Sequence, residues 1–196
     1  GGDGIDRLEG QDGNDLLEGG SGADSLLGGN GDDTLIGGAG TDRVHGENGD
    51  DFIIGGNGDV IFANAGDDFI ELDGSVDPGL ERAFIDGNDG FDTVSLVGET
   101  NTASVQRIER VIGSAGVDEL VLSDSAFVAF DITEISGVET IHAQRGDDVL
   151  TITTNDTEAV FGGLGTDRVT LTDGAGNSLL LDGVEGVTGA EGFDEV

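Results

Sequence analysis

The sequence predicts an all-β fold in which short parallel strands stack as a solenoid. Three observations support this prediction: a nine-residue word repeats from the first residue, each copy holds glycine and aspartate at fixed places, and each places an aliphatic residue eighth. A nine-residue unit is too small to bury a hydrophobic core alone, so the copies must stack on one another. Glycine is frequent, and no long segment has apolar residues at the 3.6-residue spacing of a helix. No helix is therefore expected.

The word is most regular over residues 1–71, where eight copies follow one another with one deletion inside the copy that begins at Gly55. The fourth place is always glycine, the sixth always aspartate and the eighth always aliphatic. The sixth-place residues are Asp6, Asp15, Asp24, Asp33, Asp42, Asp51, Asp59 and Asp68. A disordered acidic linker would not keep one aliphatic phase through eight copies. A run of Asp-Gly hairpins would need alternating partner strands, which the nine-residue phase does not supply.

Each part of the word has a structural reason. Glycine adopts positive φ and lets backbones approach closely, so the first places are expected to form a tight turn with inward carbonyl oxygens. The three residues after the turn are expected to form a short strand whose middle side chain faces the core. Two words make one coil, so alternate words lie above one another with their strands about 4.8 Å apart.

The chain divides into three predicted regions. Residues 1–71 form the regular array, residues 72–86 an acidic insertion or linker with the only proline, and residues 87–196 a degenerate solenoid with longer coils. In the last region the turn word recurs at irregular spacing between β-prone segments. Its aspartates are Asp92, Asp118, Asp148, Asp167 and Asp194. Because the chain begins and ends within copies of the word, we expect it to be a segment of a longer protein.

The charge of the chain limits its partners. The formal net charge is -35 at pH 7, and all seven basic residues are arginines. This excludes nucleic acid and an anionic membrane surface, because both bind basic faces. No apolar run is long enough to cross a bilayer, so no membrane insertion is expected. A compact state with this charge is destabilised by self-repulsion, so cations from solution must neutralise it.

Stacking of alternate words places the sixth-place aspartates in two columns. One column holds Asp6, Asp24, Asp42 and Asp59, and the other holds Asp15, Asp33, Asp51 and Asp68. A cation between successive carboxylates would relieve their repulsion. Ca²⁺ suits such a gap because it accepts six to eight carboxylate and carbonyl oxygens, whereas Mg²⁺ demands stricter geometry. Soft-metal ligands are scarce, with no cysteine and only His45 and His142. The stacking predicts about six calcium ions or more.

The word resembles the glycine- and aspartate-rich nonapeptide of the RTX (repeats-in-toxin) family, which forms a parallel β-roll. The resemblance is close over residues 1–71 and partial over residues 87–196. It implies a secreted bacterial protein that is exported unfolded through a type I system by a C-terminal signal. Such a protein would fold outside the cell when it meets calcium, so an extracellular location is expected.

The resemblance also implies a set of calcium ligands. The sixth-place carboxylates of both columns would bind calcium, together with Asp92, Asp118, Asp148 and Asp167 in the longer coils. The carbonyl oxygens that the resemblance adds belong to Gly2, Gly4, Gly19, Gly20, Ser21, Gly22, Gly28, Gly29, Asn30, Gly31, Gly37 and Ala39. Some copies depart from the word: Gln11, Glu47 and Asn64 replace its second glycine, and Ala63 and Ala143 its first. A carbonyl ligand tolerates such changes, but a side chain at positive φ is strained.

Other chemistry-bearing residues are given structural interpretations. Four glutamates, Glu109, Glu139, Glu158 and Glu185, each lie nine residues before a turn aspartate. They are interpreted as solvated strand positions, with completion of calcium sites as the alternative. The two histidines are expected at ordinary surface or coil positions. Phenylalanines such as Phe52, Phe62, Phe69, Phe127 and Phe130 are expected to fill the core or cap the coils.

The sequence does not predict an enzyme. It contains no H-E-x-x-H, G-x-S-x-G or P-loop motif, and a carboxylate held by calcium is a poor general acid. The leading hypothesis is a calcium-binding structural module of a large secreted or surface-attached bacterial protein, of adhesin, surface-layer or extracellular-matrix type. Further copies of the chain or cell-surface glycans are hypothetical partners besides calcium. The alternative is the calcium-dependent folding and secretion module of a hydrolase, epimerase or toxin whose catalytic domain lies outside this segment.

Overall fold

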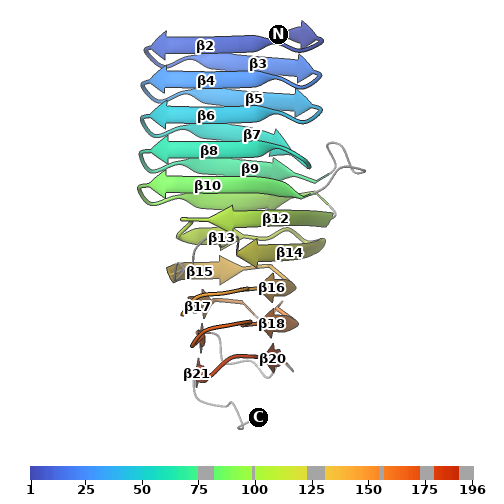
Figure 1. Cartoon of the computed structure of the whole chain (residues 1–196), viewed down its shortest axis with the longest axis vertical. Helices are drawn as coiled ribbons and strands as arrows, with labels where there is room; N and C mark the ends of the chain where they lie inside the picture. The colour runs from blue at the N-terminus through green and yellow to red at the C-terminus, as the bar shows by residue number, and fades with distance from the viewer. Residues whose placement is uncertain (75–81, 99, 123–130, 155–156, 173–178, 190–196) are drawn as a thin grey trace.

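The computed structural model describes all residues except 75–81, 99, 123–130, 155–156, 173–178 and 190–196. The described chain is all-β: every element in it is a strand. The strands stack along the long axis of the molecule, with the N-terminus at one end and the C-terminus at the other (Figure 1). The described part of the chain contains no apolar helix of the length that a bilayer crossing requires. The predicted parallel β-solenoid is confirmed.

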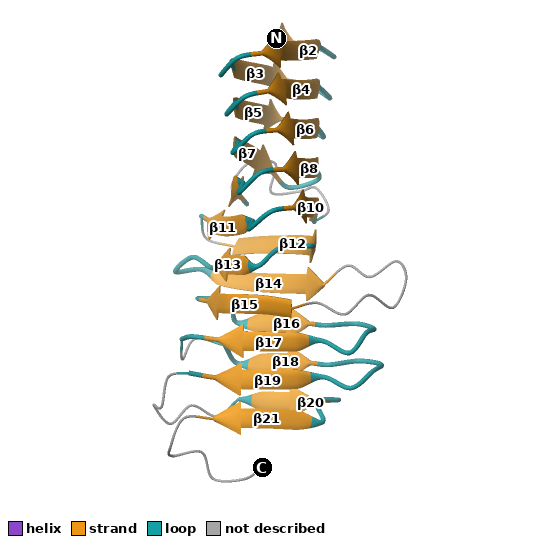
Figure 2. Cartoon of the chain, turned by 90° about the vertical axis from the view of Figure 1, so that its left-hand side faces the viewer, coloured by secondary structure: helices purple, strands orange, loops and turns teal. Residues whose placement is uncertain are grey.

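Two parallel sheets form the walls of the solenoid, and the chain alternates between them at every strand (Figure 2). One sheet has 11 strands: β1 Gly2–Asp3, β3 Leu16–Ser21, β5 Thr34–Ala39, β7 Phe52–Gly56, β9 Phe69–Asp73, β11 Thr93–Val97, β13 Arg110–Ile112, β15 Asp131–Ser136, β17 Val149–Ile152, β19 Arg168–Leu171 and β21 Gly186–Gly189. The other has 10 strands: β2 Arg7–Asp12, β4 Ser25–Asn30, β6 Arg43–Asn48, β8 Val60–Ala65, β10 Ala83–Asp89, β12 Thr100–Gln106, β14 Val117–Leu122, β16 Thr140–His142, β18 Ala159–Phe161 and β20 Leu180–Asp182. We call them the odd and the even sheet.

The register of the strands confirms that alternate words stack. Leu8 of β2 lies opposite Leu26 of β4, and Leu17 of β3 lies opposite Leu35 of β5. The strands are longer than predicted, since most in the array have six residues rather than three. Pairing continues into the first places of the next word, as between Gln11 and Gly29. Backbone groups make this ladder, so it extends across glycines whose side chains contribute nothing.

The core is a single aliphatic column that runs between the two sheets. Its members in the array are eighth-place residues, and Leu26, Leu35, Val44, Ile53, Ile61 and Ile70 are completely buried. The column continues through the longer coils with Val94, Val111, Leu120, Ile141, Val160 and Val169. Full burial of one such side chain contributes about 1.5–3 kcal/mol. Each coil therefore adds a small amount to the stability of the fold, and this amount depends on the neighbouring coils that bury its side chains.

The prediction that phenylalanine fills the core is wrong for the described residues. Phe52 and Phe69 form a ladder on the outer face of the odd sheet, with ring centroids 5.8 Å apart. On the even sheet, Phe62 stacks on His45 at 4.9 Å. These residues occupy the seventh and ninth places of the word, whose side chains point away from the core because strand side chains alternate. Phe127 and Phe130 lie outside the described residues.

The two sheets continue across the region predicted as an insertion. Leu72 and Asp73 end β9, and residues 83–86 begin β10. Strand β8 pairs with β10, and β9 pairs with β11, so both sheets continue from the array into the longer coils. The division into three regions stays a prediction.

Candidate calcium-binding turns

The first predicted carboxylate column lies at the edge of the even sheet, directly before its strands. The backbone N–H of each aspartate donates a 2.8 Å hydrogen bond to Oδ1 of the aspartate one coil further along. The bonds run from Asp6 to Asp24, from Asp24 to Asp42 and from Asp42 to Asp59. This column ends at Asp59, because Phe84 pairs with Val60 and the position opposite Asp59 is therefore Ala83. The structure thus brings the four residues together as the sequence predicts.

The second column lies before the strands of the odd sheet and is longer than predicted. Hydrogen bonds of 2.8 Å run from Asp15 to Asp33, from Asp33 to Asp51 and from Asp51 to Asp68. The N–H of Asp68 then donates to Asp92 Oδ1 at 3.0 Å, and that of Asp92 to Glu109 Oε2 at 2.8 Å. Asp92 therefore continues the column of the array.

The second oxygen of most column aspartates is buried without a hydrogen-bond partner among the described residues. This applies to Oδ2 of Asp6, Asp15, Asp24, Asp33, Asp51, Asp68, Asp92 and Asp167. Burial is the largest cause of the raised pKa values of Asp51 and Asp92, about 7, and of Asp68, about 6, and neighbouring carboxylates raise them further. A buried oxygen acceptor without a hydrogen-bond partner destabilises the fold. A row of such carboxylate oxygens therefore fits bound cations.

The first-place glycines leave room for such a partner. A Cβ atom added to Gly10 would stand 2.5 Å from the carbonyl oxygen of Gly28 and 2.8 Å from Asp15 Oδ2. A Cβ atom on Gly19 would meet the Gly37 carbonyl and Asp24 Oδ2 in the same way. Each glycine therefore borders a space lined by one carboxylate and one carbonyl oxygen. Hard cations such as Ca²⁺ take oxygen ligands of both kinds.

The predicted carbonyl ligands fall into three groups in the structure. The carbonyl oxygens of Gly19, Gly28 and Gly37 face the orphaned carboxylate oxygens across the gap between coils. Those of Ser21, Asn30 and Ala39 accept hydrogen bonds of 2.7–2.8 Å from fourth-place glycines. Gly20, Gly22, Gly29 and Gly31 adopt positive φ directly above the carbonyl groups of the preceding coil, among them those of Gly2 and Gly4. Their assignment as ligands stays a prediction.

Comparison with protein families gives one match. The family model described as the RTX calcium-binding nonapeptide repeat (4 copies) matches residues 1–35, 27–59 and 58–77. Residues 1–77 are an array of RTX repeats. No curated protein and no solved structure matches the chain. The RTX repeat is a calcium-binding structural module, and the two columns of stacked, buried aspartates in residues 1–71 have the donor chemistry for that ion.

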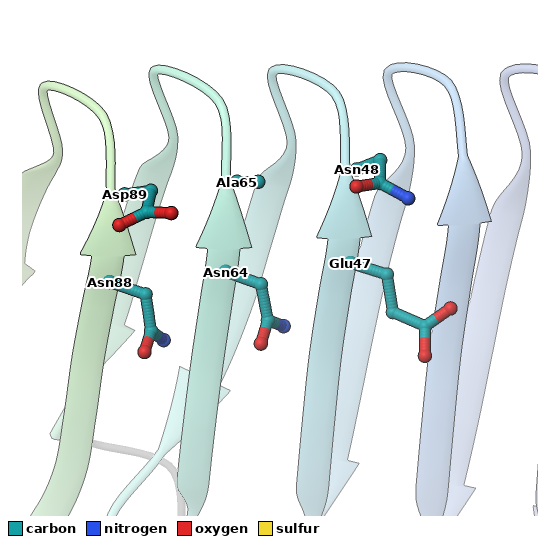
Figure 3. Close-up of a pocket in the computed structure, with 6 residues that line it drawn as sticks. All are labelled: Glu47, Asn48, Asn64, Ala65, Asn88 and Asp89. Atoms are coloured by element: carbon teal, nitrogen blue, oxygen red, sulfur yellow. The ribbon is translucent and has the colours of Figure 1, made fainter.

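The residues that replace the second glycine of the word in the RTX array keep its positive φ. Gln11, Glu47 and Asn64 have φ values of 76°, 78° and 83°. Glu47, Asn64 and Asn88 lie side by side on neighbouring strands, where they line an open, polar surface pocket with Asn48, Ala65 and Asp89 (Figure 3). Asn64 donates a 3.0 Å hydrogen bond to its own strand at Phe62. Asparagine tolerates this conformation better than most residues, which limits the strain there.

Beyond the RTX array, the predicted site residues have different surroundings. Asp148 donates its N–H to Asp167 Oδ1 at 3.0 Å, which makes a short third column. Asp118 lies on the even sheet, and its hydrogen bonds differ from those of the column aspartates. Its Oδ1 accepts a 2.8 Å hydrogen bond from Asn101, and its Oδ2 accepts bonds of 2.6 Å and 3.0 Å from the N–H and hydroxyl groups of Ser114. Both oxygens of Asp118 are therefore used within the protein.

Three glutamates have a role that their interpretation as solvated strand positions missed. Glu109, Glu139 and Glu185 accept the backbone N–H of Asp92, Asp118 and Asp167 at 2.7–2.8 Å. The carboxylate of each glutamate accepts this N–H in the way that an aspartate of the next coil does in the array. The signal in the sequence is their fixed distance of nine residues from the following turn aspartate. The spacing marks the turn, but it does not reveal which coil the side chain reaches.

Proposed function

We propose that this chain is a calcium-stiffened structural rod of a secreted or surface-attached bacterial protein. One observation carries the proposal: carboxylate oxygens that are buried without a partner among the described residues recur along the array, beside spaces lined by carbonyl oxygens. Two facts support it further. RTX repeats are calcium-binding modules of proteins that are typically secreted, and both sheets continue through the described strands from β1 to β21.

The residues that would hold calcium are the column aspartates and the carbonyl groups of the first-place glycines. Three gaps separate the aspartates of the even sheet from Asp6 to Asp59, and three separate those of the odd sheet from Asp15 to Asp68. Bound calcium would supply the positive charge that these buried carboxylates lack. The expected number of about six ions in the array follows from one ion in each gap.

Folding of the chain would then depend steeply on calcium. A ligand that binds only the folded state stabilises it by RT ln(1 + [L]/Kd) at each site. Several sites that share one stack act together, because each carboxylate faces the coil before it and the coil after it. With affinities typical of extracellular modules, about 10⁻⁴–10⁻³ M, the metal-free chain would be unfolded inside a cell and folded outside it.

A circular dichroism titration tests the proposal. In chelator the spectrum should be that of an unfolded chain, and addition of Ca²⁺ should produce a steep transition to β-structure near millimolar concentration. Mg²⁺ at the same concentration serves as the control and should not produce it, because it keeps its water and demands octahedral geometry. A β-rich spectrum in chelator would show that the carboxylate columns do not gate folding.

The role as a surface rod is tested separately, with the gene in its host. Fractionation of the cells should find the protein in the medium or released from the cell surface by chelator. A protease, lipase or pore-forming domain encoded next to this segment would instead make it a folding and secretion module. A binding role towards glycans would require retention on a glycan array that the chelator abolishes.

A further inference from the structure

We propose that Glu109 and Glu185 are calcium ligands that complete two sites outside the RTX array, one with Asp92 and one with Asp167. The inference rests on the proposed calcium function, and it assigns that function to turns that lack the nonapeptide word. Neither glutamate lies within the residues that the family model matches.

The backbone geometry at both glutamates is that of the array. In the array, the N–H of one aspartate donates to the carboxylate of the next coil at 2.8 Å. The N–H of Asp92 donates to Glu109 Oε2 at 2.8 Å, and that of Asp167 to Glu185 Oε2 at 2.7 Å. The glutamate therefore brings its carboxylate to the position that an aspartate would occupy. Its side chain is one methylene group longer than that of aspartate and reaches this position from a turn that lacks the nonapeptide word.

Both sites have an orphaned, buried oxygen of their own. Asp92 is completely buried and Asp167 is 2 % exposed, and Oδ2 of each has no hydrogen-bond partner among the described residues. A Cβ atom on Gly87 would meet Asp92 Oδ2 and the carbonyl oxygen of Arg107. One on Gly162 would stand 2.6 Å from Asp167 Oδ2 and would also meet the carbonyl oxygen of Gly183. The oxygen-lined space of the array is thus present at both glutamate turns.

The glutamates also end the columns. The N–H groups of Glu109 and Arg110 both donate to the carbonyl oxygen of Asp92, at 3.2 Å and 3.1 Å. Glu185 and Gly186 bond to the Asp167 carbonyl in the same way, both at 3.1 Å. An array aspartate instead donates its N–H forward to the next carboxylate. The N–H of each glutamate is already bonded to the coil before it. The glutamate carboxylate can accept a hydrogen bond from that coil, but its N–H cannot donate to a carboxylate of the next coil, so the column ends there.

Glu139 provides an internal contrast. It accepts the N–H of Asp118 at 2.7 Å with the same geometry. However, both oxygens of Asp118 accept hydrogen bonds from Asn101 and Ser114, so neither of them is left without a partner. The structure therefore distinguishes two glutamates that face a cation site from one that serves the backbone alone.

The test counts calcium ions on whole-chain variants by native mass spectrometry. Glu109→Gln and Glu185→Gln keep an oxygen that accepts the N–H bond and remove only the charge. Each should hold one ion fewer than the wild-type protein at the same calcium concentration. Glu139→Gln is the matched control and should hold the wild-type number. The count is taken on the folded, low-charge-state ions, so a partly unfolded sample still gives an answer.

The outcomes separate this inference from the proposed function. If Asp33→Asn loses an ion while Glu109→Gln and Glu185→Gln keep all of theirs, the glutamate sites are wrong and the array sites stand. The inference would also be overturned if Glu109→Gln, Glu185→Gln and Glu139→Gln each lost one calcium ion. Such a result would mean that replacing any of these glutamates lowers the ion count by disturbing the structure. A wild-type protein without bound calcium would overturn the proposed function itself.

Discussion

The backbone N–H of Asp33 donates a 2.8 Å hydrogen bond to Oδ1 of Asp51 in the next coil, while Oδ2 of Asp51 is buried without a partner among the described residues. One carboxylate thus does two things. Its first oxygen fixes the position of the side chain against the coil before it. Its second oxygen is left for a ligand, so the stacked coils hold each carboxylate in a fixed orientation.

Replacement of Asp51 should weaken calcium-dependent folding. Asp51→Asn keeps the Oδ1 acceptor but removes the charge, and a hydrogen bond or contact that involves a charged group contributes about 1.5–3 kcal/mol. We therefore expect the affinity of the sites that Asp51 borders to fall by about tenfold or more. A circular dichroism titration should show a higher calcium midpoint with the same final spectrum.

The neighbouring residue supplies the control for this variant. Asp50 is exposed, and its Oδ1 accepts the N–H of Asp67 at 2.8 Å, which asparagine can also do. Asp50→Asn removes the same charge one residue away and should leave the calcium midpoint close to that of the wild type. Equal shifts in both variants would mean that net charge, rather than the column, sets the midpoint.

Acid should partly replace calcium. Burial raises the pKa of Asp51 and Asp92 to about 7 and that of Asp68 to about 6, above the value near 4 of a solvated aspartate. A group whose pKa is higher in the folded state stabilises that state below its unfolded pKa, and the stabilisation is lost as pH rises through 6–7. In chelator, the β-content measured by circular dichroism should therefore be higher at pH 5 than at pH 8.

At an acidic pH where the metal-free chain is folded, calcium binding should release protons, because it displaces them from the carboxylates whose pKa burial raises. Titration calorimetry at that pH, in buffers of different ionisation enthalpy, measures the number of protons released. The wild-type protein should release more protons than Asp51→Asn, which has lost one of the groups that titrate there. A heat of binding that does not depend on the buffer would contradict the raised pKa values.

The sequence predicted the two columns but not how far the second one continues. Asp6 and Asp24 could be paired because two words close one coil, and the fixed phase of the word carries this information by itself. Glu109 could not be placed, because its turn lacks the glycines and its longer side chain reaches a coil that no spacing identifies. The position of Asp118 was predicted from the same word, yet the side chain of Asn101, 17 residues away in the sequence, and the nearby Ser114 occupy its oxygens.

The wrong position of the phenylalanines has a different cause. Phe52 follows the sixth-place aspartate directly, so strand alternation already directs it away from the core that Ile53 enters. Large apolar residues are most often buried, but here the inner positions of the array strands are taken by eighth-place aliphatic residues. The outer ladders of Phe52 with Phe69 and of His45 with Phe62 are the result.

The close approach of consecutive coils should make Gly22 irreplaceable. Its φ is 137°, and an added Cβ would overlap the carbonyl oxygen of Gly4 in the coil before it. Gly4 has a φ of 124° and open space around its Cβ position, so Gly4→Ala carries backbone strain of about 1–3 kcal/mol without a clash. Denaturant unfolding in saturating calcium should show a clearly larger loss of stability for Gly22→Ala. Similar losses would mean that positive φ alone requires these glycines.

The junction between the array and the longer coils contains an ion pair between a buried aspartate and a half-exposed arginine, and its loss should be measurable. Asp86 is 2 % exposed, and its Oδ2 accepts hydrogen bonds from the side chains of Gln106 and Arg107, while its Oδ1 has no partner among the described residues. Arg107→Met keeps most of the side-chain volume but leaves the carboxylate buried without its cation. Loss of one partner of a fully buried pair costs about 3–5 kcal/mol. Because Arg107 is half exposed, we expect about 1–3 kcal/mol.

A double-mutant cycle distinguishes this charge effect from lost packing. Asp86→Asn removes the buried charge, so Arg107→Met should cost less in that background than in the wild type. Urea unfolding in saturating calcium gives the four free energies of unfolding that the cycle needs. If the two losses add within about 0.5 kcal/mol, the arginine does not stabilise the carboxylate. A positive coupling would show that the solenoid carries one buried charge through this junction with a cation of its own, whereas the proposed function has the column aspartates take theirs from solution.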